Sequence, residues 1–213
     1  MAGLFPDPRH APGDAPLAVG EDFSPATLLE AYAQGIFPWP DGHGAVYWWS
    51  PDPRAVILVG TVRRPRSLRQ RIRHGAFLVT IDTAFEQVVR ACSDRPGDGT
   101  WITPAMRTAY MRLHAMGHAH SVEVWQDGAL VGGLYGIAIG GVFTGESMFH
   151  RVSDASKIAL VALDDHLVER GFGLIDAQLH TDHLEWMGAV SMPRRQFLDT
   201  LSRLGRAPVT FTG

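Results

Sequence analysis

Two polar side chains, Asp176 and Gln178, stand two residues apart in residues 174–179, whose other members are apolar. This segment is predicted to be a strand, on which alternate side chains point to opposite faces, so the two share one face. Burying a carboxylate beside an amide costs free energy unless the pair has a partner or a task. With Glu146 upstream, they form the predicted catalytic centre, in which the Asp176 carboxylate holds the Gln178 side-chain amide. The alternative is an Asp176 that only accepts hydrogen bonds from a loop.

Predicted strands and one helix must position this centre. An Asp-Gly pair at 127–128 between alternating apolar residues is typical of a hairpin, and Gly-Gly at 140–141 turns the chain into a strand-like run. A tight turn is predicted at 145–147. Ser153 and its neighbour are candidate caps for a helix that ends at Gly171. A meander followed by a helix and a strand is typical of the acetyltransferase-like (GNAT) fold.

The glycine-rich loop on which that fold usually holds coenzyme A is missing. Such a loop precedes the helix and cradles pyrophosphate, whereas residues 148–153 contain no glycine. The chain also has no G-x-S-x-G motif and no Gly-Lys-Ser/Thr loop, which argues against a serine hydrolase or a P-loop ATPase. The pattern of the fold is therefore present without the loop that usually holds coenzyme A.

The remaining segments alternate between helical and strand patterns. Residues 1–22 are rich in proline, glycine and aspartate and are expected to form an extended arm. Helices are predicted over 26–34, from 67, and over 83–92, 104–116 and 194–204, with strands over 55–59, 77–81, 120–125 and 129–139. We expect an α+β protein: a small N-terminal α/β domain over 1–55, then an acetyltransferase-like domain over 56–213 with a central mixed sheet and flanking helices.

Composition and cysteine content bound the class of protein. A hydrophobic fraction of 46% is sufficient for a large core, and the single cysteine, Cys92, fits a reducing compartment. The sequence shows no signal peptide and no run long enough to span a membrane. We therefore expect a soluble, cytoplasmic protein with no membrane partner.

A basic segment stands out against the formal net charge of −3. Leu68 and Ile72 are expected to face inward from a short helix, which leaves most of the arginines outside. A charge run is usually a solvated face, yet like charges repel one another unless an anion binds. The candidate anion-binding residues, with no acidic residue among them, are Arg63, Arg64, Arg66, Arg69, Arg71 and Arg73.

Aromatic and histidine side chains offer two further candidate sites. Trp39, Trp48 and Trp49 lie among prolines, and either pack between two domains or form a platform on which nucleobases stack. His114 and His118 have the H-x3-H spacing of a zinc site. Gly117 lies between them and should end the helix, so we expect no metal.

Short motifs along the chain together resemble the leucyl/phenylalanyl-tRNA–protein transferase family. They lie in order between about residues 19 and 204: GIFPWP, WWSPDPRAV, GTWIT, HAHSVEVW, GGLYG, GESMF, LIDAQ and MPRRQF. The resemblance implies transfer of leucine or phenylalanine from aminoacyl-tRNA to an acceptor protein with N-terminal arginine or lysine, marking it for N-end-rule degradation. It implies no cofactor.

The resemblance also implies roles for individual residues. Asp176 and Gln178 match the family's proposed catalytic pair, and Glu146 lies at the substrate. Trp39 and Trp101 resemble residues that line the site for the terminal adenosine and the aminoacyl group. The apolar pocket for the side chain is expected from Phe143, Leu134, Leu163, Leu167 and Ile175. Family members often carry methionine or aromatic residues at some of these positions, so the preference among leucine, phenylalanine and methionine is open.

Two other functions remain as alternatives. One is a coenzyme A-dependent N-acyltransferase of the same fold, and the other is a tRNA-binding module without catalysis. Transfer of label from leucyl-tRNA to a peptide, as against transfer from acetyl-CoA or binding alone, separates the three.

Overall fold

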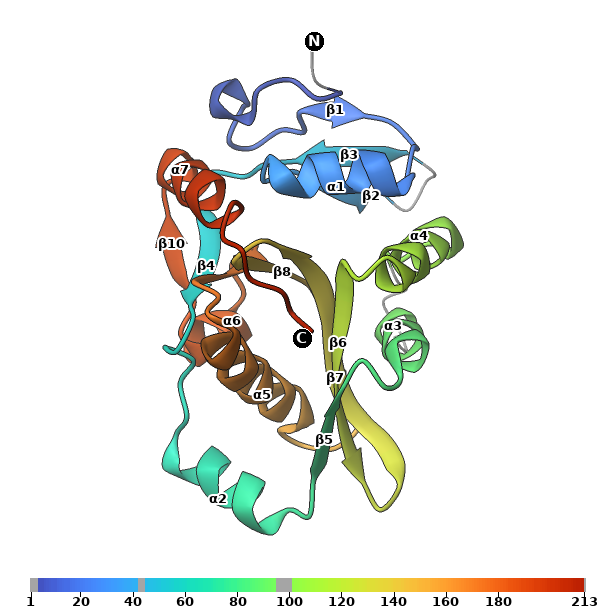
Figure 1. Cartoon of the computed structure of the whole chain (residues 1–213), viewed down its shortest axis with the longest axis vertical. Coiled ribbons are helices and arrows are strands. Elements are labelled where there is room, and N and C mark those ends of the chain that lie inside the picture. Colours follow the sequence, from blue (N-terminus) through green and yellow to red (C-terminus); the bar gives the residue numbers. More distant parts are fainter. Residues whose placement is uncertain (1–3, 42–44, 95–100, 213) are drawn as a thin grey trace.

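The computed structural model describes residues 4–41, 45–94 and 101–212 (Figure 1). Its helices are η1 (Pro8–His10), α1 (Pro25–Ala33), α2 (Arg66–His74), α3 (Phe85–Ser93), α4 (Pro104–Ala115), α5 (Ala155–Arg170), α6 (Asp182–Met187) and α7 (Arg194–Leu204). Its strands are β1 (Ala18–Val19), β2 (Phe37–Pro40), β3 (Val46–Trp49), β4 (Arg54–Leu58), β5 (Leu78–Ile81), β6 (Ala119–Gln126), β7 (Ala129–Ile139), β8 (Val142–His150), β9 (Leu174–Gln178) and β10 (Val190–Met192).

A seven-stranded mixed sheet, in the order β10-β4-β9-β8-β7-β6-β5, forms the centre of the molecule. The strands β5 to β8 pair antiparallel, whereas β8 and β9 pair parallel through the crossover helix α5, with Thr144 opposite Asp176. Helix α5 lies on one face of this sheet and α3 and α4 on the other (Figure 1). The predicted α+β architecture with a mixed sheet and flanking helices is confirmed.

Alternating side chains of β7 divide the interior into two hydrophobic clusters. Leu134 points to the α5 side, where it packs with Phe143, and Tyr135 points to the α3 and α4 side. This alternation is the two-residue period of a strand buried on both faces. The sheet therefore separates these two clusters, and a third cluster includes Phe197 of α7.

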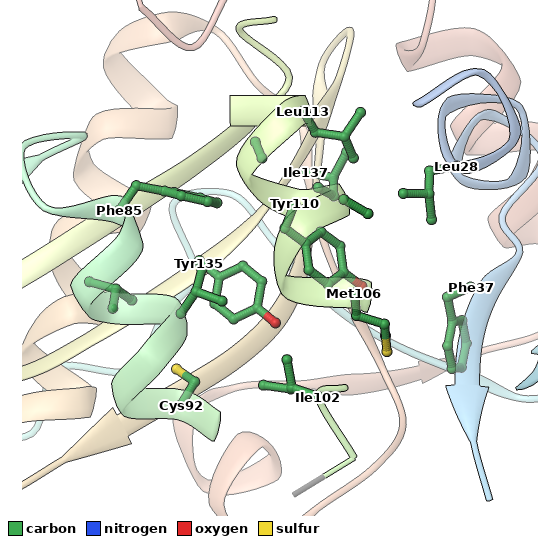
Figure 2. Close-up of a cluster of buried hydrophobic side chains, with 14 of the residues drawn as sticks. Leu28, Phe37, Phe85, Cys92, Ile102, Met106, Tyr110, Leu113, Tyr135 and Ile137 are labelled. Atoms are coloured by element: carbon green, nitrogen blue, oxygen red, sulfur yellow. The ribbon is translucent and has the colours of Figure 1, made fainter. Parts of the chain in front are cut away.

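The N-terminal segment forms a second sheet, in the order β1-β3-β2, with α1 beside it. Leu28 and Phe37 from this segment pack in the same buried cluster as Phe85, Tyr110 and Tyr135 of the larger part (Figure 2). A separate domain over residues 1–55 stays a prediction, since the two parts share one core and Arg54 already belongs to β4.

Several local predictions hold and others are wrong. The Asp-Gly turn at 127–128 joins β6 to β7, and Gly171 ends α5 in the left-handed conformation. The tight turn predicted at 145–147 is wrong, because β8 continues through these residues with only a register shift opposite Tyr135 and Gly136. Leu68 is buried as predicted, but the prediction for Ile72 is wrong, because its side chain is 37% exposed.

Gly136 is predicted to tolerate no side chain. A Cβ atom there would lie 2.5 Å from Cε1 of Phe143 and would also overlap the Thr144 carbonyl. Gly136→Ala should therefore lower the free energy of unfolding by about 1–3 kcal/mol, the usual cost of overpacking, as measured by urea titration. Gly145→Ala is the matched control, because its nearest neighbouring atom would be 3.8 Å away. Equal stability of the two variants would contradict the close packing at Gly136.

Candidate active site

A cavity of about 430 Å³ opens between β2, the sheet and the start of α6. Eight of the predicted site residues line it: Trp39, Trp101, Leu134, Phe143, Glu146, Leu163, Ile175 and Gln178. Residues that sequence reasoning did not propose also line it, among them Leu160, His183 and Leu184. The structure thus brings together most of the predicted centre.

Asp176, Leu167 and the six arginines do not line this cavity. Leu167 is fully buried in the same hydrophobic cluster as Phe143 and Ile175, so it lies behind the wall. Asp176 is also buried, at 1% exposure. A molecule that fills the cavity therefore does not contact the side chain of Asp176 or Leu167.

Two tryptophans close one side of the cavity. Trp39 of β2 and Trp101, which precedes α4, stack with ring centroids 5.2 Å apart and planes inclined by 12°. Trp48 is instead packed in the core, where its indole N–H donates to the Gly20 carbonyl. Of the two hypotheses for the aromatic segment, packing therefore applies to Trp48, whereas Trp39 lines the cavity.

A chain of hydrogen bonds leads from Gln178 into the core. Gln178 Nε2 donates to Glu146 Oε1 at 3.0 Å, and the Tyr110 hydroxyl donates to Glu146 Oε2 at 2.6 Å. The Tyr110 and Tyr32 hydroxyls lie 3.1 Å apart. Glu146 thus holds one N–H of the Gln178 side-chain amide at the wall of the cavity.

Glu146 lies in a setting that favours its protonated form. Burial raises the pKa of this carboxyl to about 7, and the negative charge of Asp176 adds to the rise. Hydrogen bonds from Tyr110, Tyr32 and Gln178 oppose the shift because they stabilise the anion. Proton uptake by Glu146 therefore occurs near neutral pH, where it alters the group to which Gln178 donates.

Asp176 pairs with Arg54, a residue that sequence reasoning missed. Arg54 Nε and Nη2 donate to Oδ1 and Oδ2 of Asp176, each at 2.7 Å, and both side chains are almost completely buried. The guanidinium lies over the rings of Phe37 and Phe197, at 4.8 and 4.6 Å. The motif WWSPDPRAV contained Arg54, but nothing local in the sequence connects it to a residue 122 positions away.

The predicted contact between the Asp176 carboxylate and the Gln178 amide is wrong. Asp176 Oδ1 accepts instead from the backbone N–H of Gln178, at 3.0 Å, and the side-chain amide goes to Glu146. The physical reason is the left-handed backbone at Gln178, with φ of 63°, which ends the alternation of β9.

The basic segment occupies α2 and the residues before it, at the opposite end of the molecule from α1 (Figure 1). The expectation of no counter-charge is wrong for Arg64, which pairs with Asp164 and Asp165 of α5 at 2.9 and 2.7 Å. Arg71 lies over the ring of Phe77. The side chains that remain exposed are those of Arg63, Arg66, Arg69, Arg71 and Arg73.

The histidines are used in other contacts. His114 Nδ1 lies 2.8 Å from the Ala119 carbonyl, and His120 Nδ1 lies 2.7 Å from Asp82. Over the described ranges, no three His, Cys, Asp or Glu residues are arranged to hold a metal ion. His183 lines the cavity, and burial together with nearby Lys157 lowers its pKa.

Among the helices of the described residues, none combines the length and apolar character that a membrane crossing requires.

Arg54→Met is predicted to destabilise the protein strongly. It leaves Asp176 as a buried carboxylate without its cation, a change that typically costs about 3–5 kcal/mol. Urea titration measures the loss. Arg9→Met is the matched control, because Arg9 pairs with Asp199 at 2.8 Å on the surface, where such a pair contributes about 1 kcal/mol or less. Similar losses in the two variants would contradict the importance of the buried pair.

Glu146→Gln is predicted to change how stability depends on pH. The folded protein, with a Glu146 pKa of about 7, retains a proton that the unfolded chain loses near 4.5. The wild-type free energy of unfolding should therefore fall as pH rises across this window, by about 3 kcal/mol at most. Urea titrations at several pH values should show a smaller fall in the variant. Identical profiles would contradict a raised pKa at Glu146.

Comparison with solved structures gives distant likenesses. L-PGS from Bacillus licheniformis aligns with a TM-score of 0.44 and 10% identity, covering 74% of this chain and 51% of that chain. A GCN5-related N-acetyltransferase from Kribbella flavida aligns with a TM-score of 0.41 and 13% identity, covering 78% and 59%.

Comparison of sequences gives close relatives. A family model described as leucyl/phenylalanyl-tRNA protein transferase matches residues 56–202, and a model of that transferase's N-terminal domain matches 21–52. The leucyl/phenylalanyl-tRNA–protein transferase of Chromohalobacter salexigens is 54% identical over 210 residues, 97% of this chain and 82% of that protein. That of Desulforapulum autotrophicum is 49% identical over 218 residues, 99% of this chain and 95% of that protein. The chain therefore belongs to the leucyl/phenylalanyl-tRNA–protein transferase family, as its motifs predicted.

Proposed function

We propose that this protein transfers leucine or phenylalanine from aminoacyl-tRNA to the N-terminal arginine or lysine of acceptor proteins. Family membership supports the reaction class. The structural observation that carries the proposal is a cavity in which an apolar wall, a tryptophan pair and the polar groups of Gln178 and Glu146 converge. A tRNA-binding module without catalysis would have no need of a buried, hydrogen-bonded amide facing such a cavity.

The apolar wall is suited to the aminoacyl side chain. Leu134, Phe143, Leu163 and Ile175 are four of the five apolar residues predicted for the pocket, and they line the cavity from three strands and α5. Burying an aliphatic or aromatic side chain there is favourable by roughly 1.5–3 kcal/mol. The face of Trp39 would take the terminal adenine by stacking, which needs no base-specific groove.

Gln178 is proposed to position the attacking amine. The donor is already an activated ester, so the protein has mainly to orient two substrates. The α-amine attacks the ester carbonyl in its neutral form, forms the peptide bond and loses one proton, and the departing ribose oxygen takes up one proton. Gln178 Oε1 is the acceptor available for an amine N–H, because its Nε2 is held by Glu146.

Asp176 is proposed to act through Gln178 rather than directly. Its carboxylate is enclosed by Arg54 and by the Gln178 backbone N–H and does not line the cavity. The pair therefore fixes the left-handed conformation from which the Gln178 side chain reaches Glu146. Asp176 and Arg54 are positioning residues in this account, whereas Gln178 and Glu146 lie at the reacting groups.

We extend the proposal to the fold, the cofactors and the cellular setting. The meander, the crossover helix and the parallel pair of β8 and β9 support an acetyltransferase-like domain over residues 56–213, preceded by a small domain over 1–55. Residues 148–153, before α5, contain no glycine, which favours chemistry without coenzyme A. A cytoplasmic location and a role in marking proteins for N-end-rule degradation follow from the proposed reaction.

Helix α2 is the proposed contact for the tRNA. Its exposed arginines can pair with phosphates of the acceptor stem, a contact that fixes position more than sequence. The helix lies at the opposite end of the molecule from β2 (Figure 1), the strand whose Trp39 lines the cavity, so it would contact the body of the tRNA rather than its aminoacyl end.

The proposed reaction is tested by supplying labelled leucyl-tRNA and labelled acetyl-CoA separately to an arginine-ended peptide. Label should reach the peptide from leucyl-tRNA alone. Label from acetyl-CoA alone would favour the coenzyme A-dependent acyltransferase, and tRNA binding without transfer would favour the non-catalytic module. A peptide with N-terminal glutamate is the control for the acceptor, and it should receive little label.

Replacing Arg66, Arg69 and Arg73 by alanine should weaken tRNA binding and its dependence on salt. Each lost phosphate contact reduces the magnitude of the slope of log K against log salt by about 0.7–0.9. The slope of the triple variant should therefore be smaller in magnitude by up to about 2–3. KM for tRNA at several salt concentrations measures this. Transfer from a short 3′-aminoacyl-adenosine should be nearly unchanged, because that donor has no stem.

The matched control replaces three other exposed arginines, Arg195, Arg203 and Arg206, on and after α7 at the far end of the molecule from α2 (Figure 1). These changes remove the same net charge. An equal flattening of the salt slope in both triple variants would indicate a general charge effect and would contradict the assignment of α2.

A further inference from the structure

The C-terminal segment that follows α7 packs against the rest of the protein. Residues 207–212 leave α7 and pass between α5 and the sheet (Figure 1). Along this C-terminal segment Val209 and Phe211 are turned inward, whereas Pro208, Thr210 and Thr212 are exposed. Phe211 is 2% exposed and belongs to the hydrophobic cluster that includes the cavity-lining Leu134, Leu163 and Ile175.

Phe211 is held in place by both its ring and its main chain. The ring stacks on His120 of β6, with centroids 4.1 Å apart and planes inclined by 16°. The Phe211 carbonyl accepts from His166 Nε2 of α5, at 2.8 Å. The segment is therefore fastened to two elements on opposite sides of it, and the ring has one defined position.

The same ring packs against Phe143 of the cavity wall. Phe143 and Phe211 have centroids 5.4 Å apart and planes inclined by 28°. Phe211 itself does not line the cavity, so it lies behind Phe143. On another side Phe143 is confined by β7, because even a methyl group at Gly136 would lie 2.5 Å from its Cε1. Phe143 thus cannot withdraw from the cavity unless Phe211 moves.

We infer that Phe211 sets the depth of the aminoacyl pocket and thereby determines the size of the side chain that the protein transfers. The inference rests on the proposed function and deepens it. Tightly packed interiors transmit a change of volume to neighbouring side chains. A smaller residue at 211 would let the Phe143 ring withdraw from the cavity, which leaves more space for an aromatic aminoacyl group than leucine needs.

The test compares phenylalanyl-tRNA with leucyl-tRNA as donors for an arginine-ended peptide. The variants are Phe211→Leu and Phe211→Met, and circular dichroism checks that each is folded. Two variants are used so that the comparison can still be made if one of them unfolds. The ratio of kcat/KM for phenylalanine to that for leucine should rise by roughly 3- to 10-fold, within the range that small changes in a hydrophobic pocket produce. Val209→Ala is the matched control, and it should leave the ratio unchanged.

The outcomes are separable. An unchanged ratio in a folded, active variant would overturn the inference, as would an equal loss of transfer from both donors, which indicates support of the fold alone. A ratio that rises equally in Val209→Ala would also overturn it. Failure of the wild-type protein to transfer from either tRNA would overturn the proposed function itself.

Discussion

The ion pair between Arg54 and Asp176 is the contact on which the rest of this structure depends. Removing two charges from water costs several kcal/mol for each ion, and only close geometry with further hydrogen bonds offsets that cost. Here the guanidinium makes two hydrogen bonds of 2.7 Å and lies between the rings of Phe37 and Phe197. Those rings come from β2 and α7, so the pair joins the N-terminal segment, the central sheet and the last helix around one buried charge.

The pair also determines how the cavity is lined. Asp176 Oδ1 also accepts a hydrogen bond from the backbone N–H of Gln178, whose backbone is in the left-handed region. From this conformation the Gln178 side-chain amide donates to Glu146, and the residue lines the cavity. The wall opposite depends on packing instead, since Phe143 is confined by β7 and Phe211. In the proposed mechanism, the position of the amine and the size of the transferred side chain therefore depend on two separate groups of residues.

The sequence was sufficient for features that depend on local chemistry. The Asp-Gly turn and the end of α5 at Gly171 follow from turn and helix-end preferences. The apolar wall residues were expected only from the resemblance of the motifs to the family. The sequence failed where the partner is distant or the backbone is unusual. Arg54 pairs with Asp176, 122 positions away, and Arg64 pairs with Asp164, 100 positions away. No sequence pattern predicts the left-handed backbone conformation of Gln178. The Arg54 contact depends on the register of β4 with β9, which periodicity alone does not fix.

The most direct test of this account is the single-turnover rate of leucine transfer in the double variant Arg54→Met, Asp176→Leu. Replacing a buried ion pair by apolar residues of similar volume is often neutral for stability, so the variant should remain folded and bind aminoacyl-adenosine. The account predicts a transfer rate lower by roughly 10²-fold or more, because Gln178 loses the contact that fixes its geometry. A folded double variant that transfers leucine at the wild-type rate would contradict the claim that the pair acts by positioning Gln178.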